Sequence, residues 1–168
     1  MGSMPQAVEE YRRLVAESYH GERVAAAVYG TLSGRATAEP ARSAFGAIAT
    51  VEDCTGDLLQ PIAARLGIPA VPVDYERAQY EYLELRGAQT WTQFLDDVAQ
   101  DWPRYIGEFR AIQEMAPPQD RAVMELVVGH ECALVDFIEL ERQGAHARAL
   151  ARLDAFLAEA LIFARRQG

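Results

Sequence analysis

The chain has 168 residues, half of them hydrophobic, which is enough for one domain with a sizeable core. Its net charge of −9, with no basic patch beyond Arg165 and Arg166, disfavours nucleic acid and anionic membrane surfaces as partners. No apolar run approaches the roughly 20 residues that span a bilayer, and no secretory signal is visible, so we expect a cytoplasmic protein. We predict a single domain over residues 1–168, with residues 1–4 as a disordered or vector-derived start.

Lysine and cysteine usage excludes several kinds of site. All sixteen basic residues are arginine, so Schiff-base chemistry on a lysine and a phosphate-loop lysine are excluded. The two cysteines, Cys54 and Cys132, lie far apart and in no paired motif. A disulfide framework and a zinc ribbon are therefore excluded as well.

Two long helices are predicted in the first part of the chain. The first covers about residues 5–33, and a stretch rich in Gly, Ser and Thr over residues 30–39 indicates a turn. The second runs from Pro40 to about Gly67, and Pro61 should kink it. Residues spaced by three and four share one face of each helix. The core stripes on these faces are Val8, Tyr11, Val15, Ser18, Glu22, Ala25, Tyr29 and Leu32, then Phe45, Ile48, Glu52, Thr55, Leu59, Ile62 and Leu66.

A connection of about twenty residues follows, with a short helix over residues 74–86 that Asp74 should cap. It is long enough to travel the length of a bundle. A third long helix is predicted over residues 90–115, interrupted at Pro103, and a fourth opens at Asp120 and closes at Gly144. The fourth helix has the stripe Met124, Val127, Glu131, Leu134 and Ile138, and a fifth over residues 145–166 should turn Leu150, Leu153, Leu157 and Leu161 inward.

No strand pattern is present. The prediction is an all-α protein: an up-down four-helix bundle with a long crossover between helices two and three, plus a fifth C-terminal helix. The mostly apolar fifth helix packs either on its own bundle or on a second copy, so a homodimer is one option.

One carboxylate interrupts the apolar stripe of three different helices, namely Glu22, Glu52 and Glu131. The midpoint between residues 22 and 52 is residue 37, inside the predicted turn, so these two should face each other. Reflection of Glu131 through the turn near residues 116 and 117 lands near residue 102. Three polar residues of the third helix lie near that level: Asp101, Tyr105 and Glu108. Buried carboxylates need metal ions, arginines or shared protons to balance them.

These residues resemble the ferritin-like superfamily of carboxylate-bridged di-metal bundles, which uses a Glu from each of two helices and Glu-x-x-His from each of the other two. Glu22 matches the first-helix Glu, and Glu52 and Glu131 match the Glu of the two motifs. Thr55 and Leu134 stand where the motif histidines belong. The resemblance implies one or two iron or manganese ions held by Glu22, Glu52, Glu131 and either Asp101 or Glu108.

His130 precedes Glu131 and lies to one side of its stripe. It is interpreted as a substitute ligand, a partner of a ligand or a general base, or else as a hydrogen-bonded histidine between helices. Tyr105 is a proton-donor candidate or a core aromatic.

Three functions stay open. The first is a metal-dependent, non-haem di-iron-like oxidoreductase that acts on a small organic substrate in the bundle core. The second is a metal-free enzyme of the same fold that uses Glu52, Glu131 and His130 as acid and base in an isomerase, lyase or cyclase reaction. The third is a non-catalytic binding bundle.

Overall fold

The computed structural model describes residues 4–167, and α-helices joined by turns and loops are its only regular secondary structure over them, which confirms the all-α prediction. Residues 1–3 of the predicted disordered start lie outside the described residues, whereas Met4 already belongs to the first helix. The helices are α1 (Met4–Arg35), α2 (Ala41–Arg65), α3 (Tyr75–Gly87), α4 (Trp91–Asp101), α5 (Pro103–Met115), α6 (Arg121–Arg142) and α7 (His146–Gln167). None of these helices is long and apolar enough to cross a membrane.

Local sequence explains most helix ends. Gly67 and Gly144 follow α2 and α6 with φ of 67° and 72°, the left-handed conformation that a glycine adopts without strain. Thr90 and Gln93 form a capping box at the start of α4, each side chain bonding the other's backbone N–H. Pro103 begins α5 and separates it from α4, as the sequence predicts.

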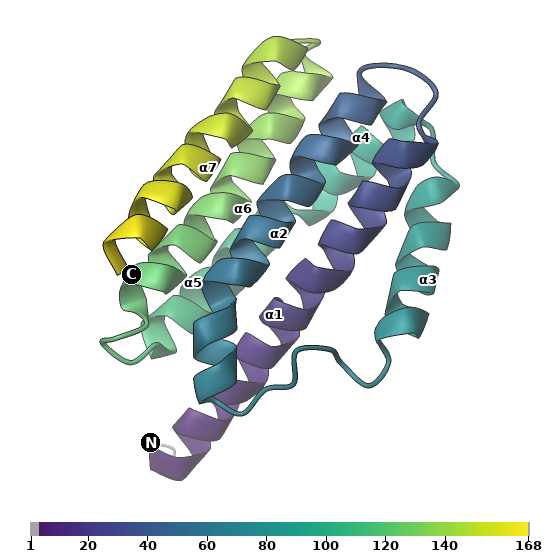
Figure 1. Cartoon of the computed structure of the whole chain (residues 1–168). Coiled ribbons are helices and arrows are strands. Elements are labelled where there is room, and N and C mark those ends of the chain that lie inside the picture. Colours follow the sequence, from purple (N-terminus) through teal and green to yellow (C-terminus); the bar gives the residue numbers. More distant parts are fainter. Residues whose placement is uncertain (1–3, 168) are drawn as a thin grey trace.

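Helices α1 and α2 pack along each other as an antiparallel hairpin (Figure 1). The turn between them is shorter than predicted, because α1 continues through Gly30 and Gly34 to Arg35. Leu32, only 6% exposed, packs into the core near this end of α1, as the predicted stripe has it, and that burial outweighs the poor helix propensity of glycine. At the other end Val8 is 60% exposed rather than buried, since α1 extends there beyond its neighbours.

Helix α3 lies in the long connection and packs against α1 (Figure 1). Asp74 is at its N-cap position, but the carboxylate pairs with Arg77 at 2.9 Å instead of capping the backbone. The one buried residue of α3 is Arg86, whose guanidinium lies over the rings of Tyr82 and Phe94. This helix is therefore attached to the rest of the molecule by few side chains.

Helix α6 contacts α2, α4, α5 and α7, and α7 also contacts α2. The inward face of α7 is formed by Ala149, Leu153, Phe156 and Ala160. The predicted leucine stripe is thus wrong at its end, because Leu161 is 55% exposed. Small alanine side chains let α7 approach its neighbours closely, a role that a search for large apolar residues does not detect.

The core consists of two clusters. One contains Val28, Tyr29 and their neighbours from α2, α4, α6 and α7, and the other contains Tyr11, Val15, Tyr19 and their neighbours from α2, α5 and α6. Between the two clusters, α1 carries Glu22, α2 carries Glu52 and Thr55, and α6 carries His130 and Glu131, all of them buried. A polar layer therefore divides the hydrophobic core at one level.

Candidate metal centre

Four ionisable side chains from three helices meet in the polar layer. Glu22 comes from α1, Glu52 from α2, and His130 and Glu131 from α6, and their exposed fractions are 5%, 6%, 0% and 7%. Each is bracketed along its helix by core residues a turn away, so the helix directs the polar group inward. The sequence prediction that Glu22 and Glu52 face each other, with Glu131 nearby, agrees with this arrangement.

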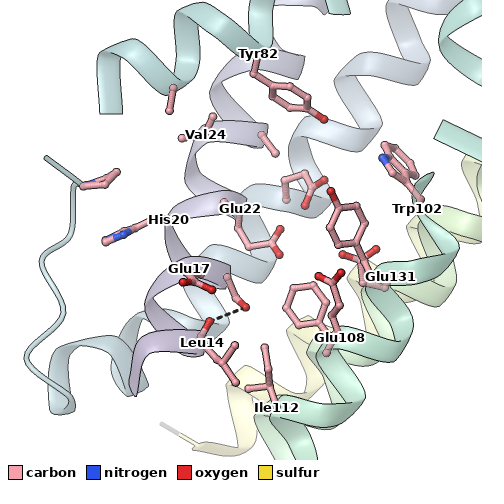
Figure 2. A pocket seen from close by; sticks show the side chains of 18 of the residues that line it. Leu14, Glu17, His20, Glu22, Val24, Tyr82, Trp102, Glu108, Ile112 and Glu131 are labelled. Carbon is pink, nitrogen blue, oxygen red and sulfur yellow. Dashed lines mark hydrogen bonds between the residues drawn. The ribbon is translucent and has the colours of Figure 1, made fainter. Parts of the chain in front are cut away.

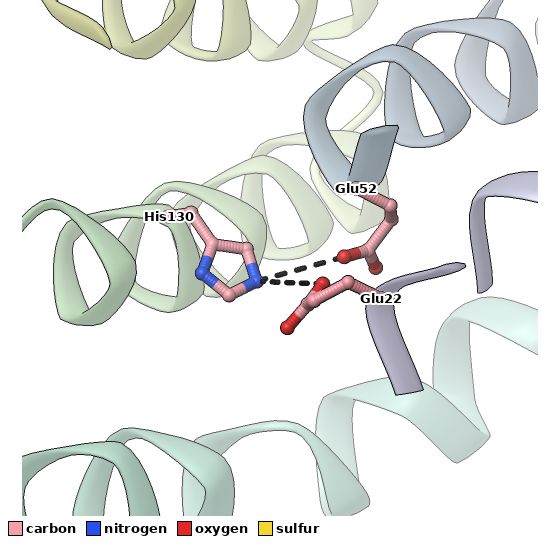
Figure 3. A group of neighbouring side chains, drawn as sticks. All are labelled: Glu22, Glu52 and His130. Atoms are coloured by element: carbon pink, nitrogen blue, oxygen red, sulfur yellow. Dashed lines mark ion pairs between the residues drawn. The ribbon is translucent and has the colours of Figure 1, made fainter. Parts of the chain in front are cut away.

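His130 stands at the centre of the group. Its Nε2 lies 3.5 Å from a carboxylate oxygen of each of Glu22, Glu52 and Glu131. Figure 3 shows the imidazole pointing from α6 toward the carboxylates of Glu22 and Glu52. The other ring nitrogen, Nδ1, is bonded to the backbone carbonyl of Val127. Because a carbonyl oxygen only accepts, Nδ1 carries a hydrogen there.

The remaining nitrogen, Nε2, is buried and has no hydrogen-bond partner among the described residues. In a neutral imidazole with hydrogen on Nδ1, the Nε2 lone pair would face three carboxylate oxygens, which is repulsive. A cation at this point removes the repulsion, whether it is a proton on Nε2 or a metal ion. A backbone carbonyl on the other ring nitrogen is also the partner that metal-binding histidines commonly have.

Burial and mutual repulsion shift the pKa values of the group. Burial raises the pKa of Glu52 well above its usual value, and the charge of Glu22 adds to the effect. Burial also raises the pKa of Glu131 to about 7, partly offset by His130. For His130 burial acts to lower the pKa, but the carboxylates of Glu22, Glu52 and Glu131 outweigh it and raise the pKa well above the usual range. The layer therefore holds positive charge tightly.

The donor set fits a metal ion. An ion that binds its donors at about 2.0–2.2 Å holds opposite donors a little over 4 Å apart. One donor atom each of Glu22, Glu52 and His130 lies within 4.8 Å of the others, and Glu131 adds an oxygen 3.5 Å from His130. Carboxylates together with an imidazole suit iron or manganese. The orphaned Nε2 atom is the feature that such an ion would satisfy.

A cavity of about 940 Å³ opens onto the polar layer (Figure 2). Glu22, Glu52 and Glu131 line it, whereas His130 does not. These three carboxylates form what we call the floor of the cavity, and His130 lies behind the floor. A small molecule in the cavity can therefore reach the carboxylates but not the imidazole. The aromatic lining residues are Tyr82, Trp102, Tyr105 and Phe109.

The predicted residues of the third helix separate into two groups. Tyr105 and Glu108 on α5 line the cavity, and Glu108 points into the same space as Glu131 (Figure 2). Asp101 is the exposed last residue of α4 and does not line the cavity, so its placement gives no support to the predicted ligand role. The break at Pro103 explains the difference, because α5 starts a new helix and sets its own inward face.

Thr55 and Leu134, the two positions where the resemblance expects histidines, also differ from each other. The Thr55 hydroxyl is fully buried and donates to the carbonyl of Val51 in its own helix at 2.9 Å. It is satisfied there and is not a lining residue of the cavity. Leu134 does line the cavity and contributes apolar surface. The histidine of the polar layer, His130, therefore directly precedes Glu131 instead of following a glutamate by three residues.

Sequence reasoning missed the part of the site that α3 supplies. Tyr82 lines the cavity, and its hydroxyl lies 2.5 Å from that of Tyr29. Burial raises the pKa of both phenols. The spacing of residues 74–86 indicates an amphipathic helix but not which face meets a cavity, so the only signal was the aromatic character of Tyr82.

Comparison with protein-family models, curated proteins and solved structures gives no match for this chain. Its function must therefore be argued from the polar layer and the cavity themselves.

Proposed function

We propose that the chain is a metal-dependent oxidoreductase of ferritin-like type that acts on a small organic substrate in the cavity. In this proposal α1, α2, the α4–α5 pair and α6 form the up-down four-helix bundle, α3 lies in the crossover, and α7 is the fifth helix. The observation that carries the proposal is the Nε2 atom of His130, which is fully buried, has no hydrogen-bond partner within residues 4–167 and lies 3.5 Å from three carboxylates of the cavity floor.

The residues divide the work as follows. Glu22, Glu52, Glu131 and His130 bind iron or manganese, and the bond from His130 Nδ1 to the carbonyl of Val127 fixes the orientation of the imidazole. The bound metal would supply the activation of dioxygen. Glu131 borders the cavity and can hold or release a proton next to a substrate.

Elemental analysis of the purified protein tests the proposal. We expect iron or manganese in the wild-type protein, and loss of that metal in Glu52→Ala. Glu125→Ala is the matched control, because Glu125 is an exposed glutamate on α6 and should leave metal content unchanged. A wild-type protein that is well folded and binds neither metal, even after incubation with each, would refute the proposal.

A second candidate is the metal-free acid/base enzyme, an isomerase, lyase or cyclase. The contact between His130 and Glu131 favours it, because Glu131 borders the cavity and His130 lies directly behind it. A protonated His130 would then balance the floor, and Glu131 would exchange a proton with the substrate. Turnover that persists after complete removal of metal distinguishes this enzyme from the oxidoreductase, and a bundle without turnover in either state would be a binding protein.

A further inference from the structure

The walls of the cavity have a distinctive charge pattern. Seven of the lining residues are acidic: Glu17, Glu22, Glu52, Asp74, Glu81, Glu108 and Glu131. No arginine is among the described lining residues, and the chain has no lysine. The one basic side chain of the lining is His20, whose Nε2 is already 2.7 Å from the carbonyl of Pro69. The lining thus offers no cationic group to a carboxylate or phosphate ligand.

The acidic residues at the edge of the cavity are paired. Glu17 pairs with Arg13 at 2.5 Å, while Asp74 and Glu81 pair with Arg77 at 2.9 and 3.9 Å. Arg13 balances Glu17, whereas Asp74 and Glu81 share one arginine and keep one negative charge at the edge. The rest of the negative charge that a ligand meets comes from the floor and from Glu108.

Glu108 is exposed like the edge residues, but it has no ion pair within residues 4–167 and faces the same space as Glu22 and Glu131 (Figure 2). A divalent ion bound by His130 and the three ionised carboxylates of the floor would leave one negative charge there. With Glu108 included the cavity stays anionic, and it also stays anionic if a protonated His130 is the only counter-charge. The net charge of the cavity is therefore negative both with one divalent ion and with a proton as the counter-charge.

Aromatic rings complete the pattern. Trp102 and Phe109 are buried and line the cavity, and Tyr82 lines it from α3. The faces of aromatic rings attract cations, most strongly for tryptophan. Two of the lining rings already have a guanidinium over them: Arg86 lies 5.3 Å from the ring centre of Tyr82, and Arg104 lies 4.8 Å from that of Tyr105 and donates to its hydroxyl at 3.0 Å. The free rings and the unpaired carboxylate are what an alkylammonium group attached to an apolar body requires.

We propose that the cavity selects organic cations, with the ammonium group of an amine held by Glu108 and its apolar body lying against Tyr82, Trp102 and Phe109. This inference rests on the proposed function for its biological meaning, because it names the substrate class of that same site. The binding itself depends on the charge and shape of the cavity and not on the identity of the metal.

The test uses matched triplets of small molecules that differ only in one group. Tryptamine, tryptophol and indole-3-propionate form an aromatic set, and hexylamine, hexanol and hexanoate form an aliphatic set. Each is added at millimolar concentration to the protein as purified, and thermal stability is measured. We expect stabilisation by at least one amine and none by the alcohols or acids. Stabilisation by an acid or alcohol equal to that by its amine, or no stabilisation by either amine, overturns the inference.

Glu108→Gln tests the assigned carboxylate by isothermal titration with the stabilising amine. We expect at least a tenfold loss of affinity with metal content unchanged, whereas Glu114→Gln, an exposed glutamate of α5 that does not line the cavity, should bind as the wild type does. Unchanged affinity in Glu108→Gln, or loss of metal from it, overturns the role given to Glu108. Amine binding by a protein that never binds metal would refute the proposed oxidoreductase and leave this inference standing. A protein that binds metal but no amine would refute this inference and leave the proposed oxidoreductase standing.

Discussion

Replacement of Glu131 by glutamine should stabilise the metal-free protein at neutral and alkaline pH but not at acidic pH. Glu131 is 7% exposed, and burial raises the pKa of its carboxyl group from 4.5 to about 7. A carboxyl group with a raised pKa in the folded state contributes its full stability below the unfolded pKa, near 4.5, and that contribution is lost as the pH rises through about 7. One pKa unit corresponds to about 1.4 kcal/mol, so the difference between the folded and unfolded pKa values changes the free energy of unfolding by about 3 kcal/mol.

Glutamine keeps the shape of the side chain but cannot ionise. Wild type and Glu131→Gln should therefore unfold with similar free energies near pH 4.5, and the variant should be more stable by up to about 3 kcal/mol at pH 8. Urea denaturation of chelator-treated protein across this pH range measures the difference. Glu125→Gln on the exposed face of α6 is the control and should show no such trend. A difference between Glu131→Gln and wild type that does not grow with pH would refute the reasoning.

Two further substitutions test contacts outside the metal donors. Thr55→Val should keep the metal and change the free energy of unfolding by only about 1 kcal/mol, because the hydroxyl bonds only the carbonyl of Val51; loss of metal in this variant would place Thr55 in the centre. Tyr11→Phe should cost about 2 kcal/mol in urea denaturation, since its hydroxyl donates to the buried carboxylate of Asp120 at 2.9 Å. Tyr80→Phe, on a ring that is 64% exposed, should be nearly neutral, and an equal effect of both changes would contradict this account.

The helical fold and the level of the polar layer were predictable because the apolar spacing of α1, α2 and α6 is regular. A carboxylate within such a stripe must face the core, as its apolar neighbours do. Glu22 and Glu52 are equally far along the chain from the turn between α1 and α2, which places them opposite each other. The error in the end of α1 did not matter, because α1 ends two residues later and α2 begins one residue later than predicted, which moves the midpoint of the turn by less than one helical turn. Periodicity and hairpin symmetry thus carry information across the bundle.

The rest of the centre depends on contacts that spacing does not encode. Position 130 lies beside the stripe, and whether its ring reaches the carboxylates or solvent depends on how α6 rotates against α5 and α7. Asp101 and Glu108 could not be separated because Pro103 starts a new helix between them, and the helical phase does not carry over such a break. The wall from α3 could not be predicted, since that helix buries little and leaves a weak hydrophobic pattern.

The division of the core into two clusters has a consequence for how the molecule unfolds. Each cluster has its own aromatic and aliphatic packing, and the layer between them contains Glu22, Glu52, His130 and Glu131. With a cation bound, this layer joins the halves by strong bonds that require all three helices to be in place. Without one, the charges repel within the layer between the halves, so the two ends of the bundle should lose protection against hydrogen exchange at different denaturant concentrations. Loading the layer should merge them into a single cooperative unit, which makes the ion a determinant of folding cooperativity as well as of chemistry.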